Sequence, residues 1–183
     1  MRLNSSSPVQ AKWVAMVLAS GVFILSIPGI SIGATVYVEP LRLGSEEGRP
    51  RSDYTDILRG LLEEKGVTIL APLRSESGEE LLPAELPKNT HVVFALVLKK
   101  STLHPDSICS GTTDSSPGRL TIGGKLRRPT GVETIFKDAT TDVTLYRSDV
   151  LCETQGMTKA AFRRIFREAM SPIAEQVVDL IKK

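Results

Sequence analysis

The sequence predicts an α+β fold: a mixed, largely antiparallel sheet with two main helices packed on one side. Two segments, residues 52–66 and 158–181, carry apolar residues at the three- and four-residue spacing of amphipathic helices. Short β-branched or alternating segments, which are typical of strands, lie before and between them. The order strand, helix, strand, strand, meander, helix favours helices that cover one face of a sheet.

The chain opens with an apolar segment. Residues 13–30 are almost entirely apolar and uncharged, and Arg2 and Lys12 precede them without any acidic residue. A basic start followed by an apolar run is typical of a secretory signal peptide. Pro28-Gly29 then ends the run, and residues 31–34 offer small side chains at which a signal peptidase can cut.

A membrane-spanning helix needs about 20 apolar residues, so an uncleaved amino-terminal anchor is the second interpretation of this segment. We therefore expect residues 1–34 to be a signal peptide or anchor and residues 35–183 to be a single α+β domain, periplasmic or secreted. No cysteine lies near the expected cut, which argues against a lipid anchor.

Export changes how the charges and the cysteines are interpreted. Without Arg2 and Lys12, residues 35–183 hold 21 basic and 21 acidic residues, so the exported part is neutral and does not resemble a nucleic-acid binder. Cys109 and Cys152 are the only cysteines, and an oxidising compartment favours a disulfide between them. Closing a loop of about 44 residues is worth about 4 kcal/mol in the chain-entropy model. Two buried thiols are the alternative.

The first half of the domain begins with a short β-branched strand over residues 34–38. Ser52 is placed to cap the first helix, and Gly66 to end it in the left-handed conformation. Residues 67–70 follow as a second strand. Residues 71–90 contain three prolines and predict a long loop, with room for a helical turn at residues 79–82.

The second half begins with the most apolar run of the domain, residues 91–100, which predicts a central strand covered on both faces. A polar stretch around Cys109 predicts a loop. Residues 119–128 predict a strand in which Gly123-Gly124 indicates a bulge. Residues 132–139 and 141–152 alternate and predict an antiparallel hairpin that turns at Ala139-Thr140. Its register places Val143, Leu145 and Arg147 opposite Thr144 and Tyr146, on a face that is only partly covered.

The last predicted helix begins after Thr158, its expected cap, and runs to Ile181. Pro172 is expected to kink it or to split it in two. Its apolar stripe consists of Phe162, Ile165, Phe166, Ala169, Ile173, Val177 and Leu180.

The sequence carries no catalytic, cofactor or metal motif that we can match. His91 opens the central strand and is expected to be structural. The segment H-P-D-S-I-C, with His104, Asp106 and Cys109, has the spacing of three metal ligands, but turn-forming residues and a disulfide explain it better. We therefore expect a protein that is not an enzyme.

Two basic clusters are the candidate interaction surface. Arg119, Lys125, Arg127 and Arg128 lie around a predicted strand, and Arg163, Arg164 and Arg167 lie beside the apolar stripe of the last helix. They offer contact with an acidic partner or with anionic lipid. The simpler interpretation is that they are the solvated sides of amphipathic elements, because arginine side chains cover apolar surface well.

Five segments together resemble a group of bacterial envelope domains. The segments are TVYVEP, SDYTDILRGLLEEKGVTIL, NTHVVFALVLKK, IFKDATTDVTLYRSD and PIAEQVVDLIKK. Their order is similar to that of the domains related to the amino-terminal domain of TolB, to the curli-secretion protein CsgG and to LpoB. Asp142 stands where those domains have a turn glycine, and the acylated cysteine of their lipoprotein members is absent.

The resemblance covers most of residues 35–182 and implies a non-enzymatic part of an envelope machine that engages a protein partner through a sheet edge or an exposed loop. It carries over no binding residue. The sequence thus predicts an exported envelope interaction or assembly module without nucleic acid or cofactor, touching a membrane only through an uncleaved signal or a basic surface. Its partner and oligomeric state are not predicted.

Two alternatives stay open. A lipid or small-amphiphile carrier would need an apolar cavity between the sheet and the last helix. An envelope hydrolase would need Ser107 or Ser110 within hydrogen-bond reach of His104.

Overall fold

The computed structural model describes residues 33–75, 80–81, 83, 85–154 and 156–183. Most of the predicted signal segment, residues 1–32, lies outside the described residues, so its export role stays a prediction. Within the described part of the chain, no helix combines the length and the hydropathy needed to cross a lipid bilayer.

Three helices and twelve strands make up the described fold. The helices are α1 (Ser52–Glu64), α2 (Asp106–Cys109) and α3 (Lys159–Ile181), with a 3-10 turn, η1 (Arg147–Asp149). The strands are β1 (Thr35–Val38), β2 (Leu41–Leu43), β3 (Pro50–Arg51), β4 (Thr68–Ile69), β5 (Leu73–Arg74), β6 (Glu80–Leu81), β7 (Thr90–Ser101), β8 (Ser115–Arg127), β9 (Glu133–Ile135), β10 (Ala139–Tyr146), β11 (Val150–Leu151) and β12 (Gly156–Met157).

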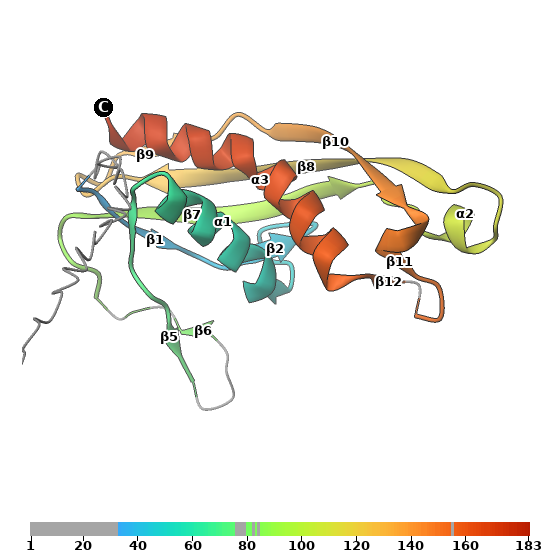
Figure 1. Ribbon diagram of the computed structural model, residues 1–183. Helices are drawn as coiled ribbons and strands as arrows, with labels where there is room; N and C mark the ends of the chain where they lie inside the picture. Colours follow the sequence, from blue (N-terminus) through green and yellow to red (C-terminus); the bar gives the residue numbers. More distant parts are fainter. Residues whose placement is uncertain (1–32, 76–79, 82, 84, 155) are drawn as a thin grey trace, which may run out of the picture.

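Strand β7 is the centre of the main sheet, as the apolar run predicts. β1 and β2 pair in parallel with successive parts of one of its edges, and β8 pairs antiparallel with the other. The order is β10-β8-β7-β1-β4, and β9 also pairs with β8. Helices α1 and α3 lie side by side on one face of this sheet (Figure 1). The predicted α+β class, with a mixed sheet and helices on one side, is confirmed.

The predicted bulge lies beside Gly124, but on the neighbouring strand β7 rather than on β8. The register shifts between Phe94 and Val97, where two residues of β7 stand opposite Gly124 alone, and again between Leu98 and Lys100. Ala95 adopts φ +48°, a conformation that non-glycine residues rarely adopt. On β8, a Cβ added to Gly124 would come within 2.9 Å of the Leu96 side chain and 3.2 Å of Phe136, so the glycine leaves room for the bulge opposite it.

The hairpin predicted at Ala139-Thr140 is wrong. Both residues lie inside β10, which pairs with β8 rather than with β9. The chain turns earlier, between β8 and β9, where Gly131 has φ +84° and the Arg128 N–H donates to the Val132 carbonyl at 2.8 Å. β8 is 13 residues long and offers its outer edge to β9 and β10 in succession, so the two segments never need to pair with each other.

Helix α1 ends as predicted but begins differently. Gly66 adopts φ +80°, and the N–H groups of Gly66 and Val67 donate to the carbonyls of Glu63 and Leu62, which is a Schellman motif. At the other end, Ser52 is the first helical residue, and the residue before it makes no capping bond through its side chain. The predicted cap is therefore wrong. The hydroxyl of Thr55, one turn later, donates to the Arg51 carbonyl instead.

The long loop over residues 71–90 holds a two-stranded pair, β5 and β6, rather than a helical turn at residues 79–82. Leu81 pairs with Leu73 and Glu80 with Arg74. β6 brings the Glu80 carboxylate back to helix α1, which no local pattern in the sequence indicates.

Helix α3 begins and packs as predicted. The Thr158 hydroxyl accepts a hydrogen bond from the Ala161 N–H at 3.2 Å, so Thr158 is the cap. Pro172 lies inside a single helix, which bends along its length (Figure 1). A proline lacks the N–H of the helical hydrogen bond, so the predicted kink fits this bend. The stripe side chains are buried except for Phe162 and Leu180, which are half-buried.

A buried ion pair joins α1, β1 and β6. The guanidinium of Arg59 donates two hydrogen bonds to Glu80, each 2.8 Å, and one of 2.7 Å to the carbonyl of Val38 in β1. Only 7% of the Arg59 side chain and 3% of the Glu80 side chain is exposed. Burial by itself lowers the pKa of Arg59, but its bonds to Glu80 and Asp56 outweigh burial and raise this pKa.

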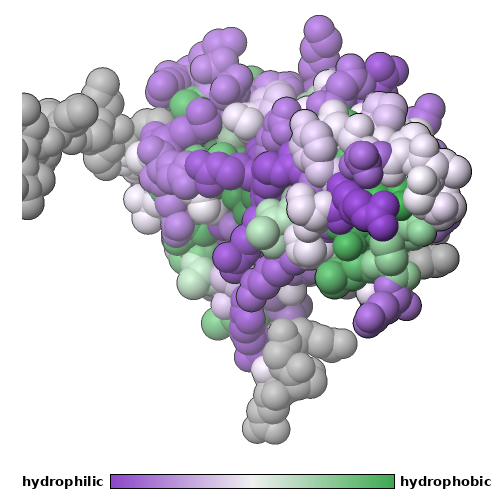
Figure 2. Space-filling model, turned by 45° about the vertical axis from the view of Figure 1, so that its right-hand side comes forward, coloured by the Kyte–Doolittle hydropathy of each residue, from purple (hydrophilic) through white to green (hydrophobic). Residues whose placement is uncertain are grey.

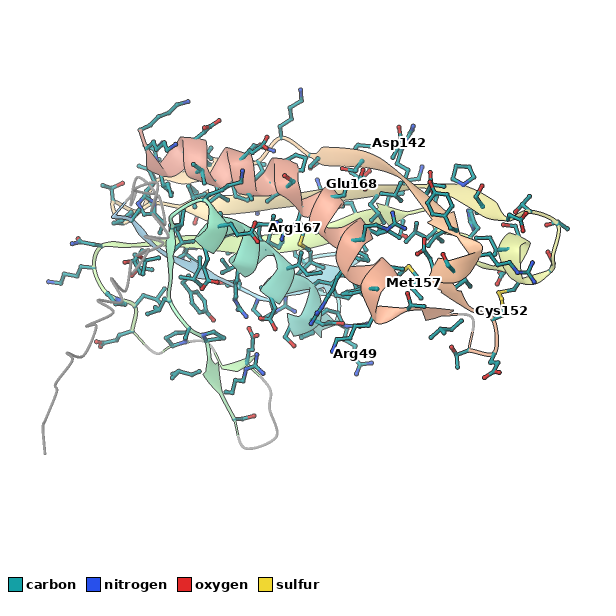
Figure 3. The ribbon with its side chains drawn as sticks, viewed as in Figure 1. Arg49, Asp142, Cys152, Met157, Arg167 and Glu168 are labelled. Atoms are coloured by element: carbon teal, nitrogen blue, oxygen red, sulfur yellow. A yellow bond between two sulfur atoms is a disulfide. The ribbon has the colours of Figure 1, made fainter. Side chains whose placement is uncertain are left out.

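The disulfide between Cys109 and Cys152 is present, with Cα atoms 5.3 Å apart. It joins the end of α2 to the segment just after β11, so it holds the two loop regions at one end of the sheet together (Figure 3). Ile108, directly before Cys109, is fully buried in the core. The disulfide thus attaches the α2 loop to the fold directly beside the core contact of Ile108.

His91 is half-buried at the start of β7. Among the described residues, its Nδ1 atom has no hydrogen-bond partner. Burial, and secondarily the positive charge of Arg128, lowers the pKa of His91. These features do not test the structural role expected from the sequence, which stays a prediction.

Replacing Arg59 with Met should lower the free energy of unfolding by about 3–5 kcal/mol, because Glu80 is left buried and unpaired. The matched control is Arg51→Met, which breaks the exposed pair with Asp53 and should cost less than about 1 kcal/mol. Urea unfolding of the two variants measures the difference. Equal losses of unfolding free energy in the two variants would show that the buried Arg59–Glu80 pair stabilises the fold no more than an exposed pair does.

Replacing Cys109 and Cys152 together with Ser should lower the free energy of unfolding by about 2–4 kcal/mol, because the unfolded chain gains the freedom of the opened loop. A reductant should destabilise the wild-type protein by a similar amount and leave the double variant unchanged. A wild-type protein that is insensitive to reductant in urea unfolding would contradict this prediction.

His91 should make stability fall below neutral pH. Its pKa in the folded protein lies below the unfolded value of about 6.5, so the folded state resists protonation and loses stability as pH falls from about 6.5 through the folded pKa. Burial raises the pKa of Glu39, which acts in the opposite sense at lower pH. Urea unfolding at about pH 7.5 and about pH 5.5 should therefore show a smaller loss for His91→Gln than for the wild type. An equal loss in both proteins would contradict the assignment.

Candidate interaction surfaces

The outer side of α1 and α3 carries a groove, which we call the helix groove. Its volume is about 670 Å³, within the range of about 300–1,000 Å³ that is common for binding pockets. α1 lines it at helical spacing, and so does the first half of α3. Its lining residues are Arg51, Asp53, Tyr54, Asp56, Ile57, Gly60, Met157, Lys159, Phe162, Arg163 and Arg167.

Aromatic side chains form the floor of the helix groove. The Tyr54 ring meets the rings of Phe162 and Phe166 edge-on, with centroids 4.7 and 4.4 Å apart. Phe166 is buried, whereas Tyr54 and Phe162 are only half-buried. Ile57 and Met157 are half-buried beside them. Figure 3 shows Met157 just before the start of α3, and Arg167 between the helices. The groove therefore presents apolar surface to any segment that enters it.

The three predicted arginines of α3 divide between the helix groove and a neighbouring ion pair. Arg164 donates to Asp149 in η1, at 2.6 Å, and Arg167 donates to Glu64 in α1, at 2.9 Å. Arg163 lies on the groove and is exposed. Residues 163 and 167 are one helical turn apart and share a face, whereas residue 164 is rotated by about 100° from residue 163. The structure brings Arg163 and Arg167, but not Arg164, to the helix groove.

The predicted cluster on β8 lies on the opposite side of the sheet and is largely neutralised. Side chains at odd positions of β8 face away from the helices, because Leu120, Ile122 and Leu126 are buried. The ion pairs on this face are Arg119–Asp142 at 2.6 Å, Lys125–Glu46 at 3.1 Å, Arg127–Glu133 at 2.8 Å and Lys99–Asp138 at 2.7 Å. The bonds with Arg119 lower the pKa of Asp142 below its ordinary value. Arg128 is half-buried and lies outside this row of pairs.

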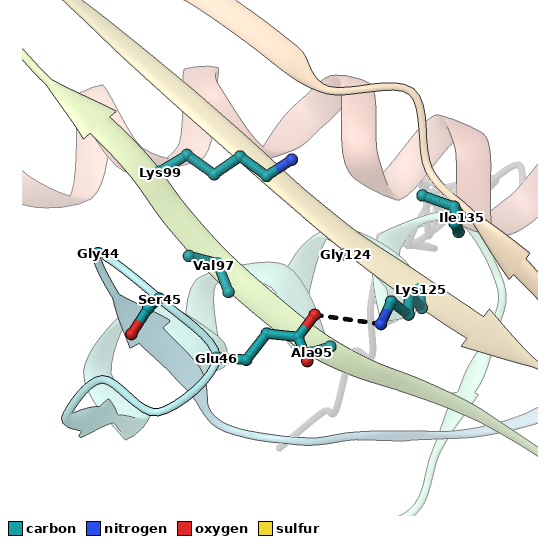
Figure 4. Close-up of a pocket in the computed structure, with 9 residues that line it drawn as sticks. All are labelled: Gly44, Ser45, Glu46, Ala95, Val97, Lys99, Gly124, Lys125 and Ile135. Atoms are coloured by element: carbon teal, nitrogen blue, oxygen red, sulfur yellow. Dashed lines mark ion pairs between the residues drawn. The ribbon is translucent and has the colours of Figure 1, made fainter.

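A shallow hollow of about 410 Å³ lies on the same sheet face, over the bulge (Figure 4). The turn between β2 and β3 forms one wall, and its Glu46 reaches across to Lys125. Ile135 of β9 lines the hollow and is 74% exposed. In this hollow Lys125 pairs with Glu46 and Lys99 pairs with Asp138. It therefore leaves fewer unpaired charges for a ligand than the helix groove.

Hydrophilic residues dominate the surface. Figure 2 shows hydrophobic residues in small areas between hydrophilic ones on the face that it presents. Large exposed apolar side chains are scattered over different elements; they are Leu73, Val132, Ile135, Tyr146 and Leu151. Among the described residues, these large apolar side chains are spread over several elements rather than gathered on one.

The serine-rich segment around α2 forms a local hydrogen-bond network. Ser107 Oγ donates to the His104 carbonyl at 3.1 Å, and Ser110 Oγ donates to the Ser107 carbonyl at 3.0 Å. These hydroxyls bond to the backbone rather than to the His104 ring. Cys109, the third residue considered as a metal ligand, has its sulfur in the disulfide. In the described part of the chain, no group of His, Cys, Asp and Glu has the geometry of a metal site.

Sequence reasoning found only part of the helix groove. The apolar spacing placed Phe162 on the stripe of the last helix, but it indicated no groove role for Arg51, Tyr54 or Lys159. The signal that could have found the groove is an aromatic residue near the start of each helical segment, Tyr54 and Phe162. The sequence does not show that the two helices lie side by side, because residues in contact, such as Glu64 and Arg167, are 103 positions apart.

No protein-family model matches the chain, and no curated protein matches it in sequence. Among solved structures, the chain is similar to a rare lipoprotein B from Shewanella oneidensis, with 11% identity and a TM-score of 0.35, over 79% of this chain and 92% of that one. It is also similar to PelC from Paraburkholderia phytofirmans, a dodecamer. One PelC crystal form gives 13% identity and a TM-score of 0.41, over 80% of this chain and 91% of that one. A PelC variant gives 14% and 0.40, over 80% and 92%. These TM-scores are below 0.5, so we base no argument about function or assembly on them.

Proposed function

We propose that the protein is an exported interaction module without catalytic activity, which binds a protein partner in the bacterial cell envelope, in the periplasm. The observation that carries the proposal is the helix groove. Its half-buried aromatic floor, Tyr54 and Phe162, lies between two helices that the sheet holds in place. A groove between rigid helices with aromatic anchors is a common docking site for a partner segment.

The disulfide supports the proposed location. Disulfides persist in oxidising compartments and are rare in the cytosol. The apolar opening segment, residues 13–30, supports the same location, because it has the composition of a signal peptide.

Two observations favour binding over catalysis. The serine hydroxyls nearest to His104 donate to backbone carbonyls, and so are not paired with a base. The acids and bases of the sheet face bond to one another in exposed pairs, rather than lying together in a pocket that excludes water.

The packing beneath α3 disfavours an amphiphile carrier. Ile165, Ile173 and Val177 are each fully buried against the sheet, together with Leu120 and Leu126 of β8. These side chains fill the space that a carrier would keep open for an acyl chain.

Cell fractionation combined with thiol alkylation tests the proposal. The full chain is expressed in its native cells, Cys109 and Cys152 are alkylated before and after reduction, and formaldehyde fixes complexes in parallel. We expect the protein in the periplasmic fraction, with both thiols protected until reduction, and in crosslinked species larger than the single chain. Free thiols on a cytosolic protein, or a chain that never crosslinks to another protein, would overturn the proposal.

A further inference from the structure

The helix groove carries an uneven set of charges. Four cations line it: Arg51, Lys159, Arg163 and Arg167. The two acids of its lining are Asp53 and Asp56. The charge that remains after internal pairing decides what kind of partner the groove attracts.

Both acids of the groove are already paired. Asp53 accepts two hydrogen bonds from Arg51, at 3.2 and 2.9 Å, which lowers the pKa of Asp53. Asp56 accepts from the buried Arg59 at 2.9 Å, and it also lies 3.8 Å from the guanidinium of the exposed Arg74. Neither carboxylate therefore has its charge free to offset the cations of α3 across the groove.

The cations of α3 are only partly paired. Arg167 bonds to Glu64, which lies just beyond the groove lining. Lys159 and Arg163 are exposed, and neither forms an ion pair with any other residue that the structure describes. They lie one turn apart at the start of α3, whose first turn contains no acidic residue. The positive end of the helix dipole adds to their charge.

We propose that the helix groove binds an acidic peptide segment of a partner protein. An apolar side chain of that segment packs on Tyr54, Ile57 and Phe162, and its carboxylates pair with Lys159 and Arg163. The inference rests on the proposed function, because it names the chemistry of the partner and the surface that the partner uses. Charge complementarity around an apolar anchor gives specificity and fast association.

An anionic membrane fits this surface less well. Membrane-binding segments of this kind use clusters of about 4–8 basic residues, whereas the groove leaves two cations unpaired beside two aspartates. The large exposed apolar side chains lie on other elements, such as Ile135 in β9, and do not form a face for insertion around the groove.

Gly60 provides a steric test of the groove. It lies on the groove side of α1, and a Cβ added there meets no atom within 4 Å. Gly60→Phe should therefore fill the groove without disturbing the packing beneath α1. Gly60→Ala is the matched control, because it leaves the groove open and favours the helix.

Two charge variants complete the set. Lys159→Glu with Arg163→Glu reverses the unpaired charges of the groove. Lys100→Glu with Lys182→Glu reverses two exposed lysines elsewhere and gives the same change in net charge. All four are surface substitutions, and circular dichroism and urea unfolding confirm that each variant is folded.

The probe is a displayed library of random 12-residue peptides, panned against the purified, oxidised protein, and the strongest peptide is then synthesised for titration. We expect enriched peptides with several Asp or Glu residues around an aromatic or large aliphatic residue. Their affinity should fall at least tenfold with Gly60→Phe and with the groove charge reversal, and should change less than threefold with either control. Affinity should also fall with added salt.

Three outcomes overturn the inference: enriched peptides that are basic or neutral, affinity that is unaffected by Gly60→Phe, and binding to phosphatidylglycerol vesicles that the groove charge reversal abolishes while no acidic peptide binds. In-cell crosslinking separates this failure from failure of the proposed function. If the charge-reversed variant still crosslinks to the wild-type partner, the groove inference fails and the proposed function stands. If the wild-type chain crosslinks to no protein, the proposed function itself fails.

Discussion

The pairing of β7 with β8 is the constraint on which the rest of the structure depends. β7 has neighbours on both edges, and β8 is long enough to hold β9 and β10 on its outer edge. The apolar side chains Leu120, Ile122 and Leu126 of β8 lie on one face of the sheet, onto which α3 packs. β7 and β8 stay paired across the bulge in β7, because Gly124 of β8 leaves room for the Leu96 side chain. Pairing that slipped by one residue would turn the apolar side chains of a strand to the other face of the sheet.

The two faces of this sheet have different chemistry. The helix side is apolar and close-packed, with α1 held against β1 by the buried Arg59 pair. The other side carries a row of exposed ion pairs, each formed by residues that neighbouring strands and turns bring together. Exposed pairs contribute little stability, but they leave that face with few unsatisfied charges. The outer side of the helices differs in having two unpaired cations, Lys159 and Arg163, beside the half-buried rings of Tyr54 and Phe162.

Most patterns within one element were readable from the sequence, the cap of α1 being an exception, whereas contacts between elements other than the disulfide were not. Thr158 as a cap, Gly66 as a stop and the burial of Val143 and Leu145 all follow from local spacing, and the structure agrees. The turn at Ala139-Thr140 was predicted wrongly, because alternating apolar and polar residues indicate a strand but not the strand with which it pairs. Arg59 was likewise unreadable as a buried residue, since Glu80 and the Val38 carbonyl that satisfy it are each 21 residues away. The helix groove required the same knowledge, because its two walls are far apart in the chain.

The outer side of α1 and α3 is the surface that we propose binds the partner. Site-specific photocrosslinking in living cells tests this most directly, with a benzophenone amino acid placed at Asp56, an exposed residue of the groove lining, or at Lys100 on β7. A partner protein should crosslink from position 56 and not from position 100. A partner that crosslinks from position 100 and never from position 56 would contradict the proposal.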